Sequence, residues 1–317
     1  IKGLGGQVAE ELVKARISEP FQNLLNVCVA AEKINRKQLE ALVKAGACDV
    51  FGHSRGVLLG SIDTALQTAS QQANNQKLGQ QDLLGEDAVD FNYMSAPELP
   101  NLIKLSYEKE TLGYYLSGHP VSECRSELND IGIKKIGLVT TSNGKIKIAG
   151  VINKMKVVKT KKGSRIAFVE FADDTGKIDV ALFDEVYTES YEALQQGGVV
   201  LVEGTPGMDQ FTQKVRLQGH KVLSLENYRV KAAPAIIIQL TKADQECVEK
   251  ITHLLHDYAG NSPVVIRYHG DKGAATFQCK QKVRLSDSMI EKIQAIAAIQ
   301  SYRLSYQVGS AQSMTES

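Results

Sequence analysis

The chain has 317 residues, 43% of them hydrophobic and 23% charged, and its formal net charge is only +1. This length allows two or three domains of ordinary size, and the hydrophobic fraction excludes wholesale disorder. No apolar run approaches the roughly 20 residues that span a bilayer, and polar residues scattered through residues 1–18 argue against a signal peptide. Because the sequence begins with Ile1, we expect it to be a fragment of a longer protein.

Residues 1–67 are predicted to be helical, because apolar residues such as Leu39, Leu42 and Val43 recur at helical spacing. The segment opens with a Gly-x-Gly turn, which exposes backbone N–H groups at the start of a helix whose dipole is positive there. With the charge of Lys2, this pattern predicts a phosphate site at Lys2, Gly3 and Gly5. The alternative is a tight turn between helices that binds no ligand.

Residues 68–100 are rich in Gln, Asn and Ser, which predicts a flexible linker. Within it, a Gln side chain can donate and accept hydrogen bonds, and two adjacent leucines can fill a pocket on a partner. We call this five-residue segment the Gln80 peptide; it consists of Gln80, Gln81, Asp82, Leu83 and Leu84. The alternative is a polar linker with leucines placed by chance.

Residues 101–140 are predicted to form a helical connector, with one helix over about 102–116 that stops at the sequence Ser-Gly-His-Pro. From Gly144 the hydrophobic period becomes two, and residues 141–230 show five predicted strands with a helix between the third and fourth. The turn Asp173-Asp174-Thr175-Gly176 joins two of these strands as a hairpin. This order is typical of an OB-fold barrel.

The first hairpin of this barrel is strongly basic. Residues 145–165 hold eight basic side chains and no acidic one. OB-folds bind single strands with positive charge along the backbone and aromatic rings under the bases, so single-stranded DNA binding is expected. The expected binding residues are Lys154, Lys156, Lys159, Lys161, Lys162, Arg165, Phe168 and Phe183, with Phe171 and Phe211 as further stacking candidates. Lysines that merely protect a strand edge are the alternative.

Residues 231–309 alternate between strand and helix in a β-α-β-β-α-β order, which predicts a small domain of ferredoxin-like type. Thr241 and a Ser288–Glu291 capping box are expected to start its two helices. Its last strand, over 302–308, is expected to present a partly open edge. Residues 310–317 are predicted to be a disordered tail. The expected fold class is therefore multidomain α+β.

The sequence offers no catalytic or metal-binding set. Two-metal nucleotide transfer needs paired carboxylates, and the adjacent Asp173 and Asp174 are explained better by hairpin-turn chemistry. His253 and His256 lie one helical turn apart without a third ligand. The five cysteines form no CxxC pair, so we expect free thiols in a reducing, cytoplasmic compartment; they are Cys28, Cys48, Cys124, Cys247 and Cys279.

Several of these stretches together resemble the carboxy-terminal part of the bacterial DNA polymerase III alpha subunit, a replicative polymerase. The stretches are residues 1–5, the run from Ile34 to Asp49, the run Glu-Thr-Leu-Gly-Tyr-Tyr-Leu-Ser-Gly-His-Pro over 110–120, and the barrel residues Lys162, Gly163, 173–176, Leu182 and Phe183. The 110–120 run is the most distinctive of them. The resemblance covers nearly the whole chain and is weakest after residue 234.

The resemblance implies a helix-hairpin-helix that grips duplex DNA and a sliding-clamp motif at the Gln80 peptide. It also implies a single-stranded-template barrel and a carboxy-terminal domain that binds the tau subunit of the clamp loader. In the Gln80 peptide, Leu84 stands where the family more often has an aromatic residue. No cofactor is expected in this fragment, because Mg²⁺ belongs to the polymerase site that it lacks. The alternatives are a free-standing OB-fold protein that binds single strands or tRNA and, with no residue set to support it, an independent nuclease or hydrolase.

Overall fold

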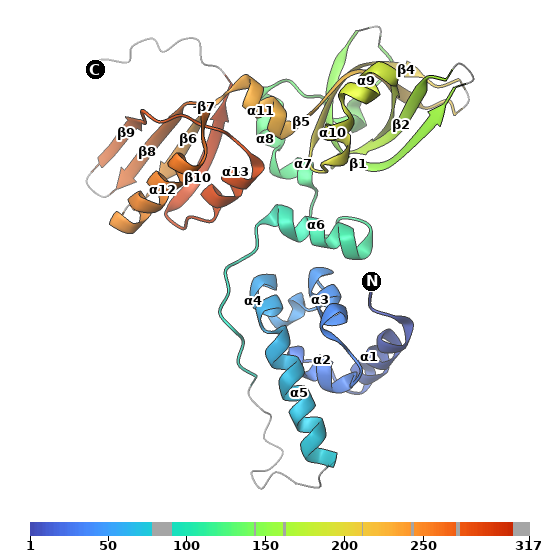
Figure 1. Ribbon diagram of the computed structural model, residues 1–317, viewed down its shortest axis with the longest axis vertical. Helices are drawn as coiled ribbons and strands as arrows, with labels where there is room; N and C mark the ends of the chain where they lie inside the picture. Colours follow the sequence, from blue (N-terminus) through green and yellow to red (C-terminus); the bar gives the residue numbers. More distant parts are fainter. Residues whose placement is uncertain are drawn as a thin grey trace. The chain divides into compact units, whose positions relative to one another are not determined.

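The computed structural model describes residues 1–77, 91–142, 144–160, 163–210, 212–241, 244–270 and 273–306. It divides into two compact units, Ile1–Gly118 and His119–Ser317 (Figure 1). The first is all helical, whereas the second contains a closed barrel and a separate four-stranded sheet. The predicted multidomain α+β class is therefore confirmed. Among the described residues, no helix combines the length and hydropathy that a membrane span requires.

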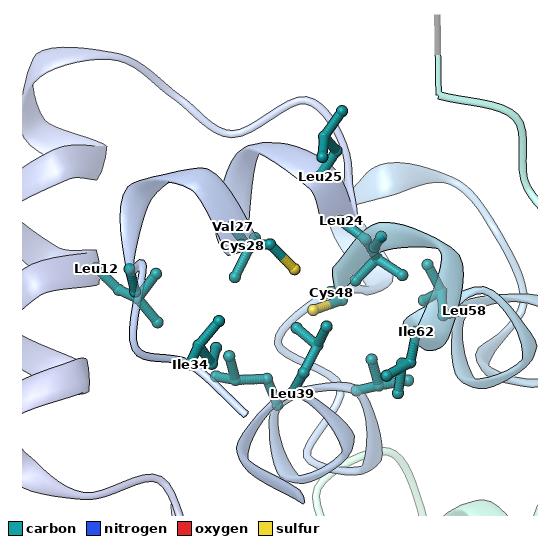
Figure 2. Close-up of a cluster of buried hydrophobic side chains, with 14 of the residues drawn as sticks. Leu12, Leu24, Leu25, Val27, Cys28, Ile34, Leu39, Cys48, Leu58 and Ile62 are labelled. Atoms are coloured by element: carbon teal, nitrogen blue, oxygen red, sulfur yellow. The ribbon is translucent and has the colours of Figure 1, made fainter. Parts of the chain in front are cut away.

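The helical unit packs around one hydrophobic cluster, which includes Leu24, Leu39, Leu58 and Ile62, all fully buried (Figure 2). Asn35 caps the third helix, since its side chain accepts from the backbone N–H of Gln38 in a reciprocal capping box. The helices are α1 (Gly6–Ser18), α2 (Leu24–Ala30), α3 (Arg36–Lys44), a short 3₁₀ turn η1 (Asp49–Phe51), α4 (Arg55–Gly60), α5 (Ile62–Lys77) and α6 (Asn101–Leu112).

Two buried cysteines belong to this cluster. Cys28 and Cys48 are each 2% exposed, and Figure 2 shows both sulfur atoms directed into the same part of the core. Burial raises the pKa of each thiol to about 12. All five cysteines are free.

The predicted linker over 68–100 is wrong at both ends. Helix α5 continues through residues 68–77, because the Gln and Ala that looked like linker composition are also good helix formers. Residues 91–100 have no regular structure but lie against the helices. Phe91 is 9% exposed, the Tyr93 hydroxyl accepts from the Leu24 N–H at 3.2 Å, and the Met94 N–H donates to the Ser61 hydroxyl at 2.9 Å.

A glycine permits this packing. A Cβ placed on Gly56 in α4 would lie 2.1 Å from the carbonyl oxygen of Pro97. Only glycine lets the two backbones come this close. The segment 91–100 is therefore held at two places, by the Tyr93 hydroxyl at the start of α2 and by the contact between Pro97 and Gly56 of α4.

Helix α6 is shorter than predicted. It ends at Leu112 because Gly113 adopts a left-handed conformation with φ of 87° and terminates the helix. The turn that follows is held by a buried acid: Oε2 of Glu108 accepts from the N–H groups of Leu116 and Ser117, at 2.7 and 2.9 Å. Glu108 thus gives the distinctive 110–120 run its shape.

The second unit begins within the predicted connector, which the structure divides at Gly118. Short helices α7 (Pro120–Glu123) and α8 (Arg125–Asp130) and the 3₁₀ turn η2 (Ile136–Leu138) lead into the barrel. Val121 of α7, Leu128 of α8 and Ile133, which lies between α8 and η2, pack with Leu201 and Leu225 in a small separate cluster.

The barrel has the predicted topology. Its closed strand order is β1-β2-β3-β5-β4, and two short helices lie between the third and fourth strands. Its core contains Phe171, Val180 and Leu217, all fully buried. The elements are β1 (Ile146–Lys159), β2 (Arg165–Ala172), β3 (Lys177–Phe183), α9 (Asp184–Glu189), α10 (Tyr191–Gln195), β4 (Val200–Met208) and β5 (Val215–Ser224).

The carboxy-terminal domain has the predicted element order but not the ferredoxin-like arrangement. Its strand order is β10-β6-β8-β9, so β6 and β8 are direct parallel neighbours. A ferredoxin-like split βαβ unit would place another strand between them. The elements are α11 (Leu225–Ala232), β6 (Ala235–Leu240), α12 (Gln245–Asp257), a short β7 (Ala259–Ser262), β8 (Val264–Gly270), β9 (Gly273–Gln278), α13 (Asp287–Gln294) and β10 (Ile299–Ser305).

Both predicted helix caps in this domain are wrong by a few residues. Asp244, not Thr241, caps α12, since its side chain accepts from the Cys247 N–H at 2.8 Å. Ser286, not Ser288, caps α13 through the Met289 N–H. In each case another good capping residue lies close by in the sequence, and composition alone does not choose between neighbours.

A buried ion pair fastens this domain to the helix that precedes the barrel. Arg229 of α11 forms two hydrogen bonds of 2.8 Å with Glu127 of α8, and a third of 2.6 Å with Asp287 of α13. Tyr306, just after β10, also donates to Glu127. Burial opposes the charge on Arg229, but the hydrogen bonds and charge of Glu127 outweigh burial and raise the pKa of the guanidinium.

Candidate nucleic-acid interface

The outer face of β1, β2, β3 and β5 carries a row of residues that includes two of those predicted to bind a single strand. Side chains alternate along a strand, so residues two apart share a face. Lys156 of β1 lies beside Phe168 of β2, Phe168 beside Ala181 of β3, and Ala181 beside Gln218 of β5. The next residue of β2, Val169, is fully buried, so the Phe168 row faces away from the core.

Two predicted stacking residues meet on this face. Phe168 is 37% exposed and Phe183 is 48% exposed. Phe183 pairs with Ile166, two residues from Phe168, so the two rings are diagonal neighbours within reach of each other. Phe171 is wrong as a stacking candidate because it is fully buried in the barrel core. Phe211 lies outside the described residues.

The predicted lysines separate into three groups. Lys154 and Lys156 are exposed and share the outer face with Phe168. Lys159 is exposed at the last position of β1, and the alternation of side chains assigns it to the face opposite to that of Lys154 and Lys156. Lys161 and Lys162 lie outside the described residues. The face therefore offers Lys156 directly beside Phe168, and Lys154 in the next row beside Glu170.

Sequence reasoning missed Arg216 of β5. Its guanidinium carbon lies 5.9 Å from the centre of the Phe168 ring, and its Nη1 lies 2.7 Å from Oδ2 of Asp209. The sequence could have indicated this residue, because the strand was predicted and the alternation of side chains places Arg216 on the same face as the exposed Gln218. Lys156 pairs with Phe168 itself, whereas Arg216 pairs with Asp179 in the neighbouring row and is held by Asp209.

Arg165, like Arg216, is already engaged by an acid of the barrel. Its Nε donates to Asp184 at 2.8 Å and its Nη2 to Thr188 at 2.9 Å, and the guanidinium lies 5.4 Å from the ring centre of Tyr187. These contacts fix the end of β2 against α9. Arg165 was predicted as a phosphate ligand, but its side chain is held by these contacts within the barrel.

Two acids limit where a polyanion can lie on this face. In the row next to Phe168, Lys154 pairs with Glu170, and Glu170 with Asp179. Lys177 lies 3.6 Å from Glu170 and only partly offsets its charge. The outer face therefore favours phosphates along the side of Phe168 and Phe183, away from Glu170.

The amino-terminal turn, where a phosphate site is predicted, is built on two glycines in the left-handed region. Gly3 and Gly5 have φ of 87° and 80°, which only glycine adopts readily. The turn is anchored by two bonds, from the Lys2 N–H to the Thr111 carbonyl and from Gln38 Nε2 to the Leu4 carbonyl, both 2.8 Å. Helix α1 begins without a side-chain cap and without an acid in its first turn. An anion is therefore compatible with its positive end.

The turn that contains Asp173 and Asp174, whose carboxylates could suggest a metal site, has a structural role. Oδ1 of Asp173 accepts from the N–H groups of Thr175 and Gly176, and its Oδ2 from the Ile136 N–H. Burial alone would raise the pKa of Asp173, but the hydrogen bonds from Thr175 and Ile136 lower it below the ordinary value. His253 and His256 are exposed on α12. Within the described part of the chain, no group of three or more His, Cys, Asp or Glu residues is arranged to hold a metal ion.

Of the two remaining predicted sites, the structure describes only the second. The Gln80 peptide lies outside the described residues. The last strand of the carboxy-terminal domain, β10, is an edge strand of its sheet, as predicted.

Comparison with known proteins supports two of these regions separately. Residues 1–58 match the helix-hairpin-helix motif, and residues 146–225 match the OB-fold nucleic acid binding domain. Among solved structures, the second OB-fold domain of replication protein A from Methanococcus maripaludis is similar to 29% of this chain and 94% of its own, with 18% identity and a TM-score of 0.24.

Curated relatives match almost the whole chain. DNA polymerase III subunit alpha of Vibrio cholerae is 29% identical over 311 residues, and that of Pseudomonas aeruginosa is 31% identical over 324 residues. Each match covers 93% of this chain and 27% of the relative. The chain thus spans about a quarter of the length of these relatives, in their carboxy-terminal region.

Fold and site together define a nucleic-acid-binding chain that combines a helix-hairpin-helix unit with an OB-fold barrel. The match to the curated relatives along almost the whole sequence is more specific than this class. The chain is a relative of the carboxy-terminal region of DNA polymerase III subunit alpha, and the resemblance inferred from the sequence is confirmed.

Proposed function

We propose that this chain is the non-catalytic carboxy-terminal region of a replicative DNA polymerase, and that it holds the polymerase on DNA and on its partners. The barrel contacts the single-stranded template, and the amino-terminal turn contacts duplex phosphates through Lys2, Gly3 and Gly5. The Gln80 peptide binds the sliding clamp, and the carboxy-terminal domain docks the tau subunit of the clamp loader. Nucleotide transfer, with its Mg²⁺, belongs to the remainder of the polymerase.

The observation that carries the proposal is the exposed Phe168 ring, with Phe183 diagonal to it and Lys156 beside it. A base stacked on this ring would leave a phosphate within reach of Lys156. Stacking on an aromatic ring is tolerant of sequence, because every base has a π face. The barrel is therefore suited to hold a template whatever its sequence.

Replacing Phe168 with alanine is expected to weaken binding of the chain to a single-stranded DNA oligonucleotide about 10-fold, since one stacked base contributes roughly 1–3 kcal/mol. Fluorescence anisotropy with a labelled oligonucleotide measures this. Phe277→Ala is the matched control, because Phe277 is also an exposed phenylalanine (56%) but lies on the carboxy-terminal sheet. Equal affinity of the Phe168→Ala variant and the parent chain would reject the proposed template surface.

The same assay distinguishes the contribution of the lysines to DNA binding from that of the Phe168 ring. Lys154→Gln with Lys156→Gln should flatten the dependence of log affinity on log salt concentration, by about 0.7 for each phosphate that the chain no longer neutralises. Phe168→Ala should leave that slope unchanged. A clear preference for RNA over DNA by the parent chain would favour the free-standing RNA-binding alternative.

The Gln80 peptide is tested on the clamp itself. A labelled sliding clamp is titrated with the chain and with a Gln80→Ala, Leu83→Ala, Leu84→Ala variant, and saturable binding should be lost only in the variant. Gln71→Ala with Gln72→Ala, in the neighbouring helix α5, is the control. Binding that survives in the triple variant would place the tether elsewhere. In the whole polymerase, deletion of residues 80–84 should lower processive synthesis and spare single-nucleotide addition, because a tether acts through effective concentration.

A further inference from the structure

The sheet of the carboxy-terminal domain ends on a strand that is exposed on both faces. Strand β9 is the outermost member of the order β10-β6-β8-β9. Every residue of β9 is exposed except Ala275, which is half-buried, and Phe277 is 56% exposed. Within the described residues, no element covers this strand.

The backbone of β9 is open to pairing along its outer side. The Cys279 N–H donates to the Val264 carbonyl of β8 at 2.9 Å. Since alternate residues of an antiparallel strand point to opposite sides, Ala275 and Phe277 also face β8. The N–H and C=O groups of Ala274, Thr276 and Gln278 therefore point outward.

Nothing in β9 protects this edge. Proteins commonly guard an edge strand with a lysine, a proline or a β-bulge. The sequence Gly-Ala-Ala-Thr-Phe-Gln has no charge and no proline, and its register with β8 runs without a shift over the described residues. An unguarded edge of this kind is a template for another strand.

The two faces beside the edge differ in chemistry. On one face, Phe277 pairs with Ile266 and Ala275 with Tyr268, which makes it apolar. On the other face, Thr276 pairs with Arg267 and Ala274 with His269, and both Arg267 and His269 are exposed.

The chain beyond β9 adds more positive charge. Lys280 is exposed directly after β9, and residues 273–284 contain no acid; Lys282 and Arg284 are also exposed, but they lie beside β7, and Arg284 is 3.8 Å from Glu226. A strand added to β9 would therefore meet apolar groups on one side and basic groups on the other.

We propose that β9 is the docking strand for an extended acidic peptide of a partner protein, which joins the sheet as a fifth strand. Its alternate side chains are apolar against Phe277 and acidic against Arg267. The inference rests on this sheet alone and stands whether or not the domain docks the clamp loader subunit.

Two other occupants fit less well. A second copy of the chain paired through β9 would bring together two basic edges, with no acid in residues 273–284 to offset them. A nucleic acid would need stacking and phosphate contacts on one side, yet Phe277 and Arg267 lie on opposite faces of the sheet. Charge complementarity thus selects the acidic peptide.

The test uses a fluorescein-labelled synthetic peptide of about eight residues, matched to the length of a strand, in which valine and glutamate alternate. Anisotropy with the whole chain should show saturable binding at least 10-fold tighter than to a peptide with the same residues in two blocks, or to one with lysine in place of glutamate. Amide hydrogen exchange should slow at Ala274, Thr276 and Gln278 when the alternating peptide binds.

Thr276→Pro removes an outward N–H without touching the bonds to β8, and should weaken peptide binding at least 10-fold. Phe277→Ala should weaken it less, and Phe168→Ala should leave it unchanged. Circular dichroism verifies that each variant is folded. Absence of saturable binding, equal binding of the block peptide, or equal binding by folded Thr276→Pro would overturn the proposal. So would self-association of the chain, or DNA binding, that Thr276→Pro abolishes.

Discussion

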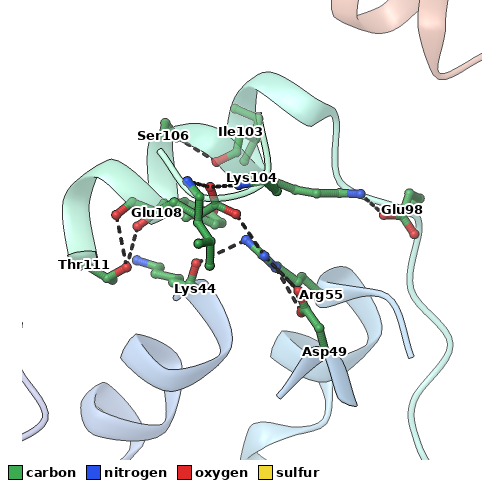
Figure 3. A network of polar contacts seen from close by, with 12 residues as sticks. Lys44, Asp49, Arg55, Glu98, Ile103, Lys104, Ser106, Glu108 and Thr111 are labelled. Atoms are coloured by element: carbon green, nitrogen blue, oxygen red, sulfur yellow. Dashed lines mark hydrogen bonds and ion pairs between the residues drawn. The ribbon is translucent and has the colours of Figure 1, made fainter. Parts of the chain in front are cut away.

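Replacing Glu108 with alanine is expected to lower the free energy of unfolding of the helical unit by about 3–5 kcal/mol, the range for breaking a buried ion pair. The carboxylate is fully buried, and its Oε1 lies 3.0 Å from Nη2 of Arg55, which also binds Asp49 (Figure 3). The substitution would leave Arg55 without its buried partner and the Leu116 and Ser117 N–H groups without an acceptor.

Hydrogen exchange read by mass spectrometry measures this unit separately from the other. Peptides from residues 1–118 should exchange faster in the variant, and peptides from residues 119–306 should not change. Glu110→Ala is the matched control, since Glu110 lies on the same helix with its side chain 64% exposed and only a 3.7 Å contact to Lys44. A decrease below about 1 kcal/mol, or an equal decrease with Glu110→Ala, would show that the buried ion pair matters little.

The same ion pair makes the helical unit sensitive to acid. Burial would raise the pKa of Glu108, but the hydrogen bonds from Ser117, Leu116 and Arg55 hold it below its ordinary value of 4.5. A depressed carboxylate pKa stabilises the fold above the pKa of the unfolded state, and this contribution is lost as the pH falls through the lower, folded value. We expect the stability of the unit to fall below about pH 4.5, and to fall less steeply in a Glu108→Gln variant. Identical pH profiles would contradict this.

The second large effect is expected at Arg229. Its side chain is 6% exposed and that of Glu127 is 10% exposed, so Arg229→Ala would leave a buried carboxylate with only the Tyr306 hydroxyl. We expect the free energy of unfolding to fall by about 3 kcal/mol, with faster hydrogen exchange in both α8 and the sheet of the carboxy-terminal domain.

Arg303→Ala is the control for this second prediction. Arg303 joins the same two regions through Asp130 at 3.3 Å, but it is 69% exposed, so its removal should cost less than about 1 kcal/mol. If Arg229→Ala affected only the helix that bears it, the ion pair would not be what fastens the domain to α8.

The barrel was predictable because its signals are local. Strands of period two, the Asp-Asp-Thr-Gly turn and a helix before the fourth strand determine an OB-fold without knowledge of distant contacts. The carboxy-terminal sheet was predictable only in element order. The local sequence does not determine whether β8 or another strand lies beside β6, so the prediction of a ferredoxin-like arrangement was wrong.

The site was predictable in part for similar reasons. Phe168, Phe183, Lys154 and Lys156 follow from composition and alternation, and the structure places them on one face. Arg216 comes from a strand far along the chain and reaches Phe168 only because β3 and β5 pair. The linker prediction was wrong over the last part of α5, because a Gln-rich composition is compatible with both a linker and a helix.

The fastening of residues 91–100 has a mechanical consequence. The segment 78–90 starts at the end of α5 and ends at Phe91, so the helical unit holds both of its ends. Tension on a partner bound to that segment would pull on α5 through its last turn and, on the other side, would peel Phe91 and Tyr93 from the helices before it reached α6. The core contact of Phe91 and the bond from the Leu24 N–H to the Tyr93 hydroxyl would thus be the first connections to bear the load on that side.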